Sequence, residues 1–231
     1  MHFKIAWRMF WRELRKGELW IIAFALVLAV VTVVSLTGIT ESVRSALMQR
    51  SSSFMAADKV LRSPLPFNSA YFDTAAQLQL KSARQMQFNT MVFADDVMQL
   101  VSVKAVSAEY PLRGKLVLKA TDKIVELTPG HVYVEKRVMQ LLQLDIGDKL
   151  SIGATELILG GVIDQEPDAP TAGFTGQPRI LMHINDVAAT KVVQPGSQIN
   201  YRYLFAGTEA QLKQLQISLE AKLTPSDRWQ Q

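Results

Sequence analysis

The sequence predicts an α+β protein with a single N-terminal transmembrane helix, and three observations support this fold class. Residues 19–39 form an apolar run without any charge. After this run, helix-like and strand-like periodicities alternate, and no repeat of fixed period is present. The 191 residues from 41 to 231 are enough for a domain with its own core. We therefore expect one membrane helix followed by one large domain outside the bilayer.

The apolar run Leu19–Ile39 is 21 residues long. At a rise of 1.5 Å per residue this corresponds to about 31 Å of helix, which matches the hydrocarbon thickness of a bilayer. A cleaved signal peptide is the alternative, but its apolar region is usually about 7–15 residues and ends at a small-x-small site. Residues 37–41 contain no convincing site of this kind.

Basic residues are concentrated before the apolar run: Lys4, Arg8, Arg12, Arg15 and Lys16. The positive-inside rule therefore places the N-terminus in the cytoplasm and the chain after about Thr40 outside it. The first 18 residues supply +3 of the net charge of +4. Because no further basic stripe with interleaved aromatic residues follows, nucleic-acid binding is not expected.

Residues 1–18 are predicted to form a cytoplasmic amphipathic helix that lies in the plane of the membrane. Aromatic and basic side chains recur in it at helical spacing, and this pattern is typical of the headgroup region. The predicted membrane-interface residues are Trp7, Arg8, Trp11, Arg12 and Trp20. In the alternative interpretation, these residues only flank and anchor the span.

Helical composition continues through residues 42–50, so residues 19–50 are predicted to form the transmembrane helix and a stalk, interrupted by the serines at 51–53. Beyond the stalk the patterns predict a strand, a helix and two strands joined by a turn at 94–96. These four elements are expected at 58–62, 69–80, 85–93 and 96–106.

After residue 106 the sequence predicts a β-rich segment with one helix at 135–143. Its strands are expected at 115–118, 131–134, 149–152 and 156–163. A long Pro/Gly loop at 164–178 follows, and the chain ends with a strand at 199–206 and a helix at 208–223 that Thr208 caps. This order predicts that residues 107–197 are inserted into a unit formed by 51–106 and 198–231.

The sequence nominates no catalytic, cofactor-binding or metal-ligating residue. Cysteine is absent, and no phosphate-binding loop or nucleophile elbow is present. Asp164, Glu166 and Asp168 could suit a hard cation, but Pro167 interrupts them, so a solvated or hinge-like loop is favoured. Phe174 is a candidate partner contact, although a buried loop aromatic is the alternative. A membrane-bound hydrolase is disfavoured because no nucleophile and base can be named together.

Several strings, in this order, resemble the MacB/FtsX class of ABC transporter permeases, and most closely its YbbP-type members. They are MVFADD (91–96), VSAEYPLRG (106–114), VYVEKRVMQLLQLDIGDKLSIG (132–153), LGGVIDQEPD (159–168) and PRILMHINDVAATKVVQPGSQINYRYLFAG (178–207). The resemblance implies a periplasmic core in which 51–106 and 198–231 form a porter-like subdomain and 107–197 form an inserted sabre-like subdomain. It also implies a bacterial inner-membrane location.

The resemblance further implies a non-catalytic permease subunit that works by mechanotransmission. ATP and Mg would be bound by a separate cytoplasmic ABC ATPase, and the cargo would be lipophilic or envelope-associated. Family members carry at least four spans, whereas only one is predicted here, so we expect this chain to be the N-terminal portion of a longer permease. Membrane lipid, the remaining transmembrane part and a periplasmic partner protein are the other expected contacts. The alternative is a membrane-anchored scaffold that recruits an extracytoplasmic enzyme.

Overall fold

The computed structural model describes residues 20, 24–32, 34–35, 56–119, 121–124, 127–169, 176–194 and 196–230, with only the backbone described for 121–124. The chain divides into two compact units, Met1–Ser51 and Ser52–Gln231. In the first unit, the described residues are helical, and their large apolar side chains are 53% to 69% exposed. No helix among the described residues is both long enough and apolar enough to cross a membrane. The transmembrane helix at 19–39 therefore stays a prediction.

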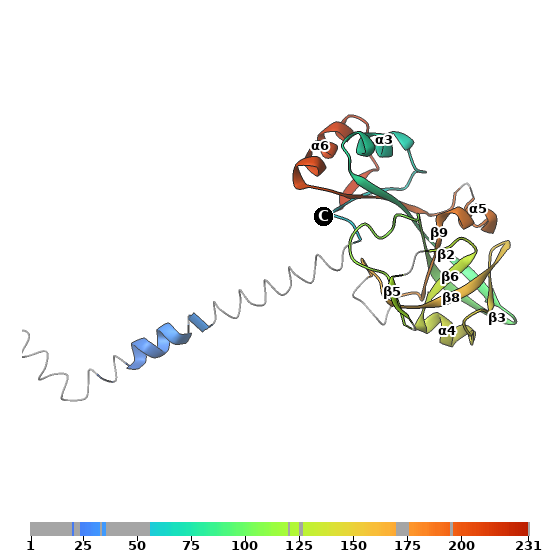
Figure 1. Ribbon diagram of the computed structural model, residues 1–231, viewed down its shortest axis with the longest axis horizontal. Coiled ribbons are helices and arrows are strands. Elements are labelled where there is room, and N and C mark those ends of the chain that lie inside the picture. Colours follow the sequence, from blue (N-terminus) through green and yellow to red (C-terminus); the bar gives the residue numbers. More distant parts are fainter. Residues whose placement is uncertain are drawn as a thin grey trace, which may run out of the picture. The chain divides into compact units, whose positions relative to one another are not determined.

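The second unit is built on one mixed sheet of 11 strands (Figure 1). The strand order is β11-β1-β10-β2-β3-β9-β6-β8-β4-β5, and β7 pairs with β2 and β8. The strands are β1 (Lys59–Ser63), β2 (Lys81–Ala94), β3 (Val97–Val106), β4 (Val117–Leu118), β5 (Thr121–Ile124), β6 (His131–Glu135), β7 (Lys149–Ile152), β8 (Thr155–Gln165), β9 (Arg179–His183), β10 (Asn200–Ala206) and β11 (Arg228–Gln230). Two pairs, β3–β9 and β6–β8, are parallel.

Two helices, α3 (Ser69–Gln77) and α6 (Glu209–Glu220), pack together over the end of the sheet that contains β1 and β10 (Figure 1). Both begin at a side-chain cap, because Asn68 accepts a hydrogen bond from the backbone N–H of Ala70 and Thr208 forms a reciprocal capping box with Gln211. Their apolar residues surround Tyr203 and Phe205 of β10 in one buried cluster. The alternate residues of β10 consequently face the other side of the sheet.

The helix α4 (Lys136–Leu142) covers the sheet near β3, β6 and β8. Its buried Val138 and Leu142 belong to the largest core cluster, together with Val101 and Val103 of β3. A short 3₁₀ helix η1 (Ile184–Asp186) and a one-turn helix α5 (Val187–Thr190) follow β9 directly.

The predicted strands and helices are present with shifted ends. The turn between β2 and β3 lies at Asp95 and Asp96, as predicted. Strand β8 has an irregularity at Gly160, because the β6–β8 register passes from Leu159 directly to Gly161. Gly161 also approaches β4 closely, since a Cβ at this position would lie 2.7 Å from Leu118 Cδ1.

Several elements were not predicted, and one loop is shorter than expected. Strands β5, β9 and β11 and the short helices η1 and α5 were missed. The loop at 164–178 was predicted too long, because β8 continues to Gln165 and β9 begins at Arg179. Ser52–Gln231 is one compact unit, so the division into 107–197 and its two flanking segments stays a prediction.

Candidate functional site: a cavity lined by ion pairs

A row of polar side chains crosses the sheet on the face opposite α3 and α6. Arg202 of β10 lies between Tyr201 and Tyr203, which face the apolar clusters, so its side chain points to the other face. The register places Arg62 of β1 and Gln85 of β2 on either side of Arg202. One step further along the hairpin, Gln87 of β2 is paired with Lys104 of β3.

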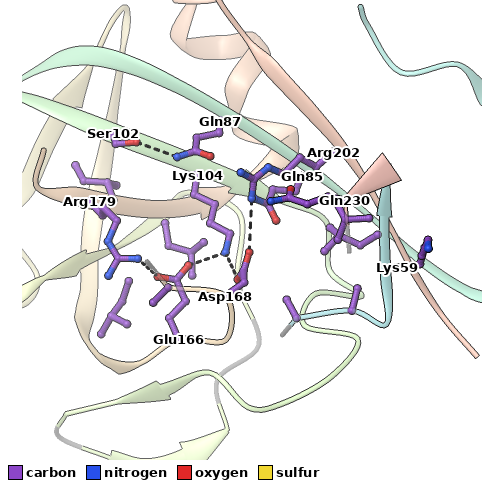
Figure 2. Close-up of a pocket in the computed structure, with 18 of the residues that line it drawn as sticks. Lys59, Gln85, Gln87, Ser102, Lys104, Glu166, Asp168, Arg179, Arg202 and Gln230 are labelled. Carbon is purple, nitrogen blue, oxygen red and sulfur yellow. Dashed lines mark hydrogen bonds and ion pairs between the residues drawn. The ribbon is translucent and has the colours of Figure 1, made fainter. Parts of the chain in front are cut away.

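This polar face forms one wall of a cavity of about 430 Å³ (Figure 2). The segment after β8 supplies Glu166 and Asp168 to another wall, and residues 56–60 border the cavity as well. The labelled lining residues are Lys59, Gln85, Gln87, Ser102, Lys104, Glu166, Asp168, Arg179, Arg202 and Gln230. Charged groups therefore line a partly buried space, which is uncommon unless each charge has a partner.

Lys104 is the centre of the ion-pair network. Its Nζ lies 2.8 Å from Glu166 Oε1, 2.6 Å from Asp168 Oδ1 and 2.7 Å from the hydroxyl oxygen of Tyr110. The Lys104 side chain is 12% exposed and that of Glu166 only 3%. Since an ammonium group has three N–H donors, this cation has no free donor left for a further ligand.

Arg179 neutralises the far side of Glu166. Its Nη1 donates to Glu166 Oε2 over 3.0 Å, and its Nε lies 3.6 Å from Glu135 Oε2. Glu166 is therefore held between two cations, and its burial is compensated by charge-assisted hydrogen bonds.

Tyr110 closes the network from the loop after β3. Its hydroxyl lies 2.9 Å from Asp168 Oδ1 and 3.1 Å from the carbonyl oxygen of Pro167, while the Lys104 ammonium lies 4.5 Å from its ring centroid. Burial and the neighbouring carboxylates of Asp168 and Glu166 raise the pKa of Tyr110 well above its usual value. Tyr110 is therefore protonated at physiological pH and can act as a donor.

The expectation for the three acidic residues at 164–168 is wrong for two of them. A solvated or hinge-like loop was favoured, but Glu166 is buried and Asp168 is ion-paired, because Lys104 and Arg179 supply opposite charges that the local sequence does not contain. Asp164 alone is exposed, at the end of β8. No group of three or more potential metal ligands is found in the part of the chain that the structure describes.

Two buried polar atoms facing the cavity have no hydrogen-bond partner: Gln85 Oε1 and Arg202 Nε. The only carboxylate near Arg202 among the described residues is Asp168, with Oδ2 at 3.9 Å from Arg202 Nη1. Burial and the charge of Arg62 lower the pKa of Arg202, although Asp168 and Tyr110 oppose this. One wall of the cavity is thus positively charged and incompletely bonded, which suits the binding of a polar ligand.

Sequence reasoning did not find this cavity, and most of the residues it predicted lie elsewhere. Trp20 is on the exposed surface of the first unit, at 68% exposure. Trp7, Arg8, Trp11, Arg12 and Phe174 lie outside the described residues. No signal in the sequence indicated it, because Gln85, Gln87 and Lys104 occupy the polar positions of alternating strands, a pattern typical of a solvent-facing side.

The comparison of sequences shows that the chain with this cavity is similar to a protein of the ABC transporter permease class. The relative is the uncharacterized ABC transporter permease YbbP of Escherichia coli (strain K12), which is 39% identical over 222 residues. The match covers 96% of this chain and 27% of the relative, so the chain spans about a quarter of that protein's length. The resemblance to YbbP-type permeases predicted from the sequence is confirmed.

Solved structures of two transporter domains were also compared. The extracellular domain of the noncanonical ABC-type transporter YknZ from Gram-positive bacteria matches with a TM-score of 0.49 at 9% identity. The match covers 75% of this chain and 100% of the YknZ domain. The periplasmic region of MacB from Actinobacillus actinomycetemcomitans also matches with a TM-score of 0.49 at 9% identity. This match covers 76% of this chain and 89% of the MacB region. No family model matches the sequence.

Proposed function

We propose that this chain forms the first membrane segment and the periplasmic domain of a permease subunit that works by mechanotransmission. The observation that carries the proposal is the 39% identity to an ABC transporter permease over 96% of the chain. In this proposal a separate cytoplasmic ATPase binds ATP and Mg, the permease sits in the inner membrane, and motion reaches the periplasmic domain through the stalk. The cargo is lipophilic or envelope-associated, and the chain itself performs no catalysis and binds no cofactor.

The apolar surface of the described N-terminal helix supports a membrane location. Trp20 and Phe24 are 68% and 69% exposed, and Leu28 and Val31 are 58% and 55% exposed. A helix that exposes apolar side chains all around its circumference is stabilised by lipid rather than by water.

The position of β1 and β11 supports the transmission of motion. These strands are antiparallel neighbours at one edge of the sheet, and Val60 pairs with Gln230. The first and last strands of the second unit are therefore adjacent, an arrangement that would suit a domain inserted between two membrane segments. A displacement applied at this edge would move the whole sheet, because its strands are joined by continuous backbone hydrogen bonds.

The proposed topology can be tested by labelling single cysteines, because the chain has none of its own. Asp96→Cys places a thiol in the exposed turn between β2 and β3. We expect a membrane-impermeant maleimide to label it in intact spheroplasts and to label Lys4→Cys only after lysis. Labelling of Asp96→Cys that requires lysis would contradict the periplasmic placement.

The proposed coupling can be tested in the full permease together with its ATPase. Replacing Val43, Arg44, Ser45 and Ala46 by glycine, outside the described residues, should soften the predicted stalk because glycine disfavours helix by about 1 kcal/mol per residue. We expect ATP hydrolysis to continue while cargo handling is lost. Alanine at positions 43–45 is the matched control, since it removes the side chains and keeps helix propensity. Unchanged cargo handling in the glycine variant would refute the stalk mechanism.

A second candidate function, recruitment of an extracytoplasmic enzyme, is favoured by the exposed surface of the β2–β3 hairpin. Cross-strand pairs Phe93–Met98 and Met91–Leu100 share one face, and these four residues are 36% to 64% exposed. We call them the hairpin surface. Asp95 and Asp96 border it, so a partner would offer an apolar recess with a cationic rim.

Recruitment is tested with the double variant Phe93→Ser, Met98→Ser in the full chain. If the hairpin surface binds an enzyme, an enzymatic activity should copurify with the membrane-bound parent chain and be lost from the double variant. Ile217→Ser is the matched control, because Ile217 on α6 is 65% exposed and lies outside the hairpin surface. Equal copurified activity in both variants would exclude this role for the hairpin.

A further inference from the structure

The cavity contains a buried hydrogen-bond acceptor and a buried donor that the protein does not satisfy. Gln85 is 1% exposed, and its Oε1 has no partner. Arg202 Nε, on the neighbouring strand in register, also has none. An unpaired buried polar group destabilises a fold, because it has lost its hydrogen bonds to water and gained none in return. Two such groups beside each other, both lining one cavity, are explained if a ligand supplies the missing acceptor and donor (Figure 2).

The charges show what kind of acceptor is missing. Lys104 and Arg179 are engaged by Glu166, Asp168 and Glu135 at distances from 2.6 to 3.6 Å. Arg202 has only a carboxylate at 3.9 Å. Arg62, its partner in the β1–β10 register, donates to the neutral amide oxygen of Asn200 over 3.1 Å, and no described carboxylate lies within ion-pair distance of it.

Burial lowers the pKa of Arg202, and repulsion from the adjacent guanidinium group of Arg62 lowers it further. An oxyanion that carries more than one charge, such as phosphate, would relieve the repulsion. It would also match the planar arrangement of guanidinium N–H donors.

We propose that this cavity binds a phosphate group that carries a neighbouring N–H or O–H donor. The phosphate accepts from Arg202 Nε, while the neighbouring donor reaches Gln85 Oε1. Arg62 does not line this cavity, and it adds positive charge from the neighbouring strand. The volume of about 430 Å³ lies within the range of about 300–1,000 Å³ that is usual for small-molecule sites, so the cavity accommodates a phosphate with a small substituent. The phosphate could belong to a free solute or to a lipid headgroup. The inference concerns the domain alone and does not depend on the proposed transport mechanism.

The test measures binding to the purified full-length chain in detergent at constant ionic strength. Inorganic phosphate and glycerophosphoethanolamine are the soluble probes, and nanodiscs of phosphatidylethanolamine with phosphatidylglycerol present the same group on lipids. Equilibrium dialysis and the thermal midpoint Tm are recorded, with chloride as the reference anion. We expect at least one phosphate probe to bind and to raise Tm where chloride does not.

Two variants and one control locate the site. Arg202→Gln and Gln85→Leu should each weaken phosphate binding at least about tenfold, because each removes a hydrogen bond to the ligand. Gln85→Leu should keep or raise Tm without ligand, since it removes an unsatisfied buried acceptor, so its loss of binding would not reflect unfolding. Arg137→Gln is the matched control, because exposed Arg137 on α4 does not line the cavity and donates to the backbone carbonyl of Gly176.

The test distinguishes a free phosphate compound from a lipid headgroup, and it can also refute the proposal. Binding of soluble probes assigns the site to a free phosphate compound, and binding only in nanodiscs assigns it to a lipid headgroup; either supports the proposal when Arg202→Gln abolishes it. No binding of any probe, or equal binding by Arg202→Gln and the parent chain, overturns it.

Discussion

The hydroxyl oxygen of Tyr71 lies 3.0 Å from Asp227 Oδ2 and connects α3 to the turn before β11, 156 residues later in the chain. The same hydroxyl lies 2.9 Å from the carbonyl oxygen of Lys222. Tyr71 is 2% and Asp227 6% exposed. Burial and the hydrogen bond to Asp227 raise the pKa of Tyr71 to about 12, so this phenol remains a donor. Through this contact, the end of the chain is held against the helix layer.

Removal of the Asp227 carboxylate should flatten the dependence of stability on pH. Burial alone would raise the pKa of Asp227, but hydrogen bonds from Ser63, Thr224 and Tyr71 lower it below 3.8. A carboxyl with a lowered folded pKa stabilises the fold above its unfolded pKa, and this contribution is lost as the pH falls through the lower folded value. For Asp227→Asn we expect a smaller loss of the free energy of unfolding between pH 6 and 3.

Denaturant unfolding of the full chain across this pH range measures the effect. Asp95→Asn is the control, since it removes an exposed carboxylate to which no described group donates a hydrogen bond. The same slope for Asp227→Asn and the parent chain would show that this carboxylate is not linked to stability.

Replacement of Lys104 by methionine should leave the buried carboxylate of Glu166 and the partly buried carboxylate of Asp168 without their main cation. We expect a loss of about 3–5 kcal/mol in the free energy of unfolding, because breaking one side of a buried ion pair leaves an uncompensated charge. Lys149→Met is the control, since the Lys149–Glu156 pair is 72% and 59% exposed and such a pair contributes about 0–1 kcal/mol. Chemical denaturation followed by tryptophan fluorescence compares the two. If Lys104→Met and Lys149→Met cause a similarly small loss in the free energy of unfolding, the charges of the Lys104 network are screened by solvent.

Gly153→Ala should destabilise the contact between the β7–β8 turn and α5. Gly153 has φ +58°, and a Cβ there would lie 2.1 Å from the backbone oxygen of Thr190. Neither the left-handed backbone nor a backbone clash can be relieved by a rotamer change, so we expect a loss of about 2–4 kcal/mol. Gly176→Ala has free space around it and should change stability by less than about 0.5 kcal/mol. Thermal unfolding of both variants and the parent chain at equal protein concentration measures these changes. Equal stability of Gly153→Ala and Gly176→Ala would contradict the expected clash.

Thr208→Ala should weaken α6 at its first turn. The Thr208 hydroxyl accepts from the backbone N–H of Gln211, while the Gln211 side chain accepts from the backbone N–H of Thr208 over 2.9 Å. Loss of this capping box should cost about 1 kcal/mol. Gln214→Ala, at an exposed position of the same helix, should be neutral or slightly stabilising because alanine has the higher helix propensity. Equal stability of the two variants would show that the cap is dispensable.

The elements that were predicted correctly have strong local signals. The β2–β3 hairpin follows from alternating apolar residues and the Asp95–Asp96 turn, and α6 follows from Thr208 and the spacing of Leu212, Leu215 and Leu219. Strand β9 was missed although Ile180–Met182 are apolar. Its short run does not distinguish a strand from a helix, and its partners β3 and β6 are distant in sequence.

Most helices and strands could be predicted from the sequence alone, and so could the similarity to ABC transporter permeases. These properties depend on residues close together in the chain or on the order of local strings. Only the tertiary structure decided that Lys104 meets Glu166 and Asp168, which are 62 and 64 residues away, and that Gln85 and Arg202 share one cavity wall. The sequence around a charged residue in a strand does not indicate its ion-pair partner, because the register of the sheet determines which residues meet.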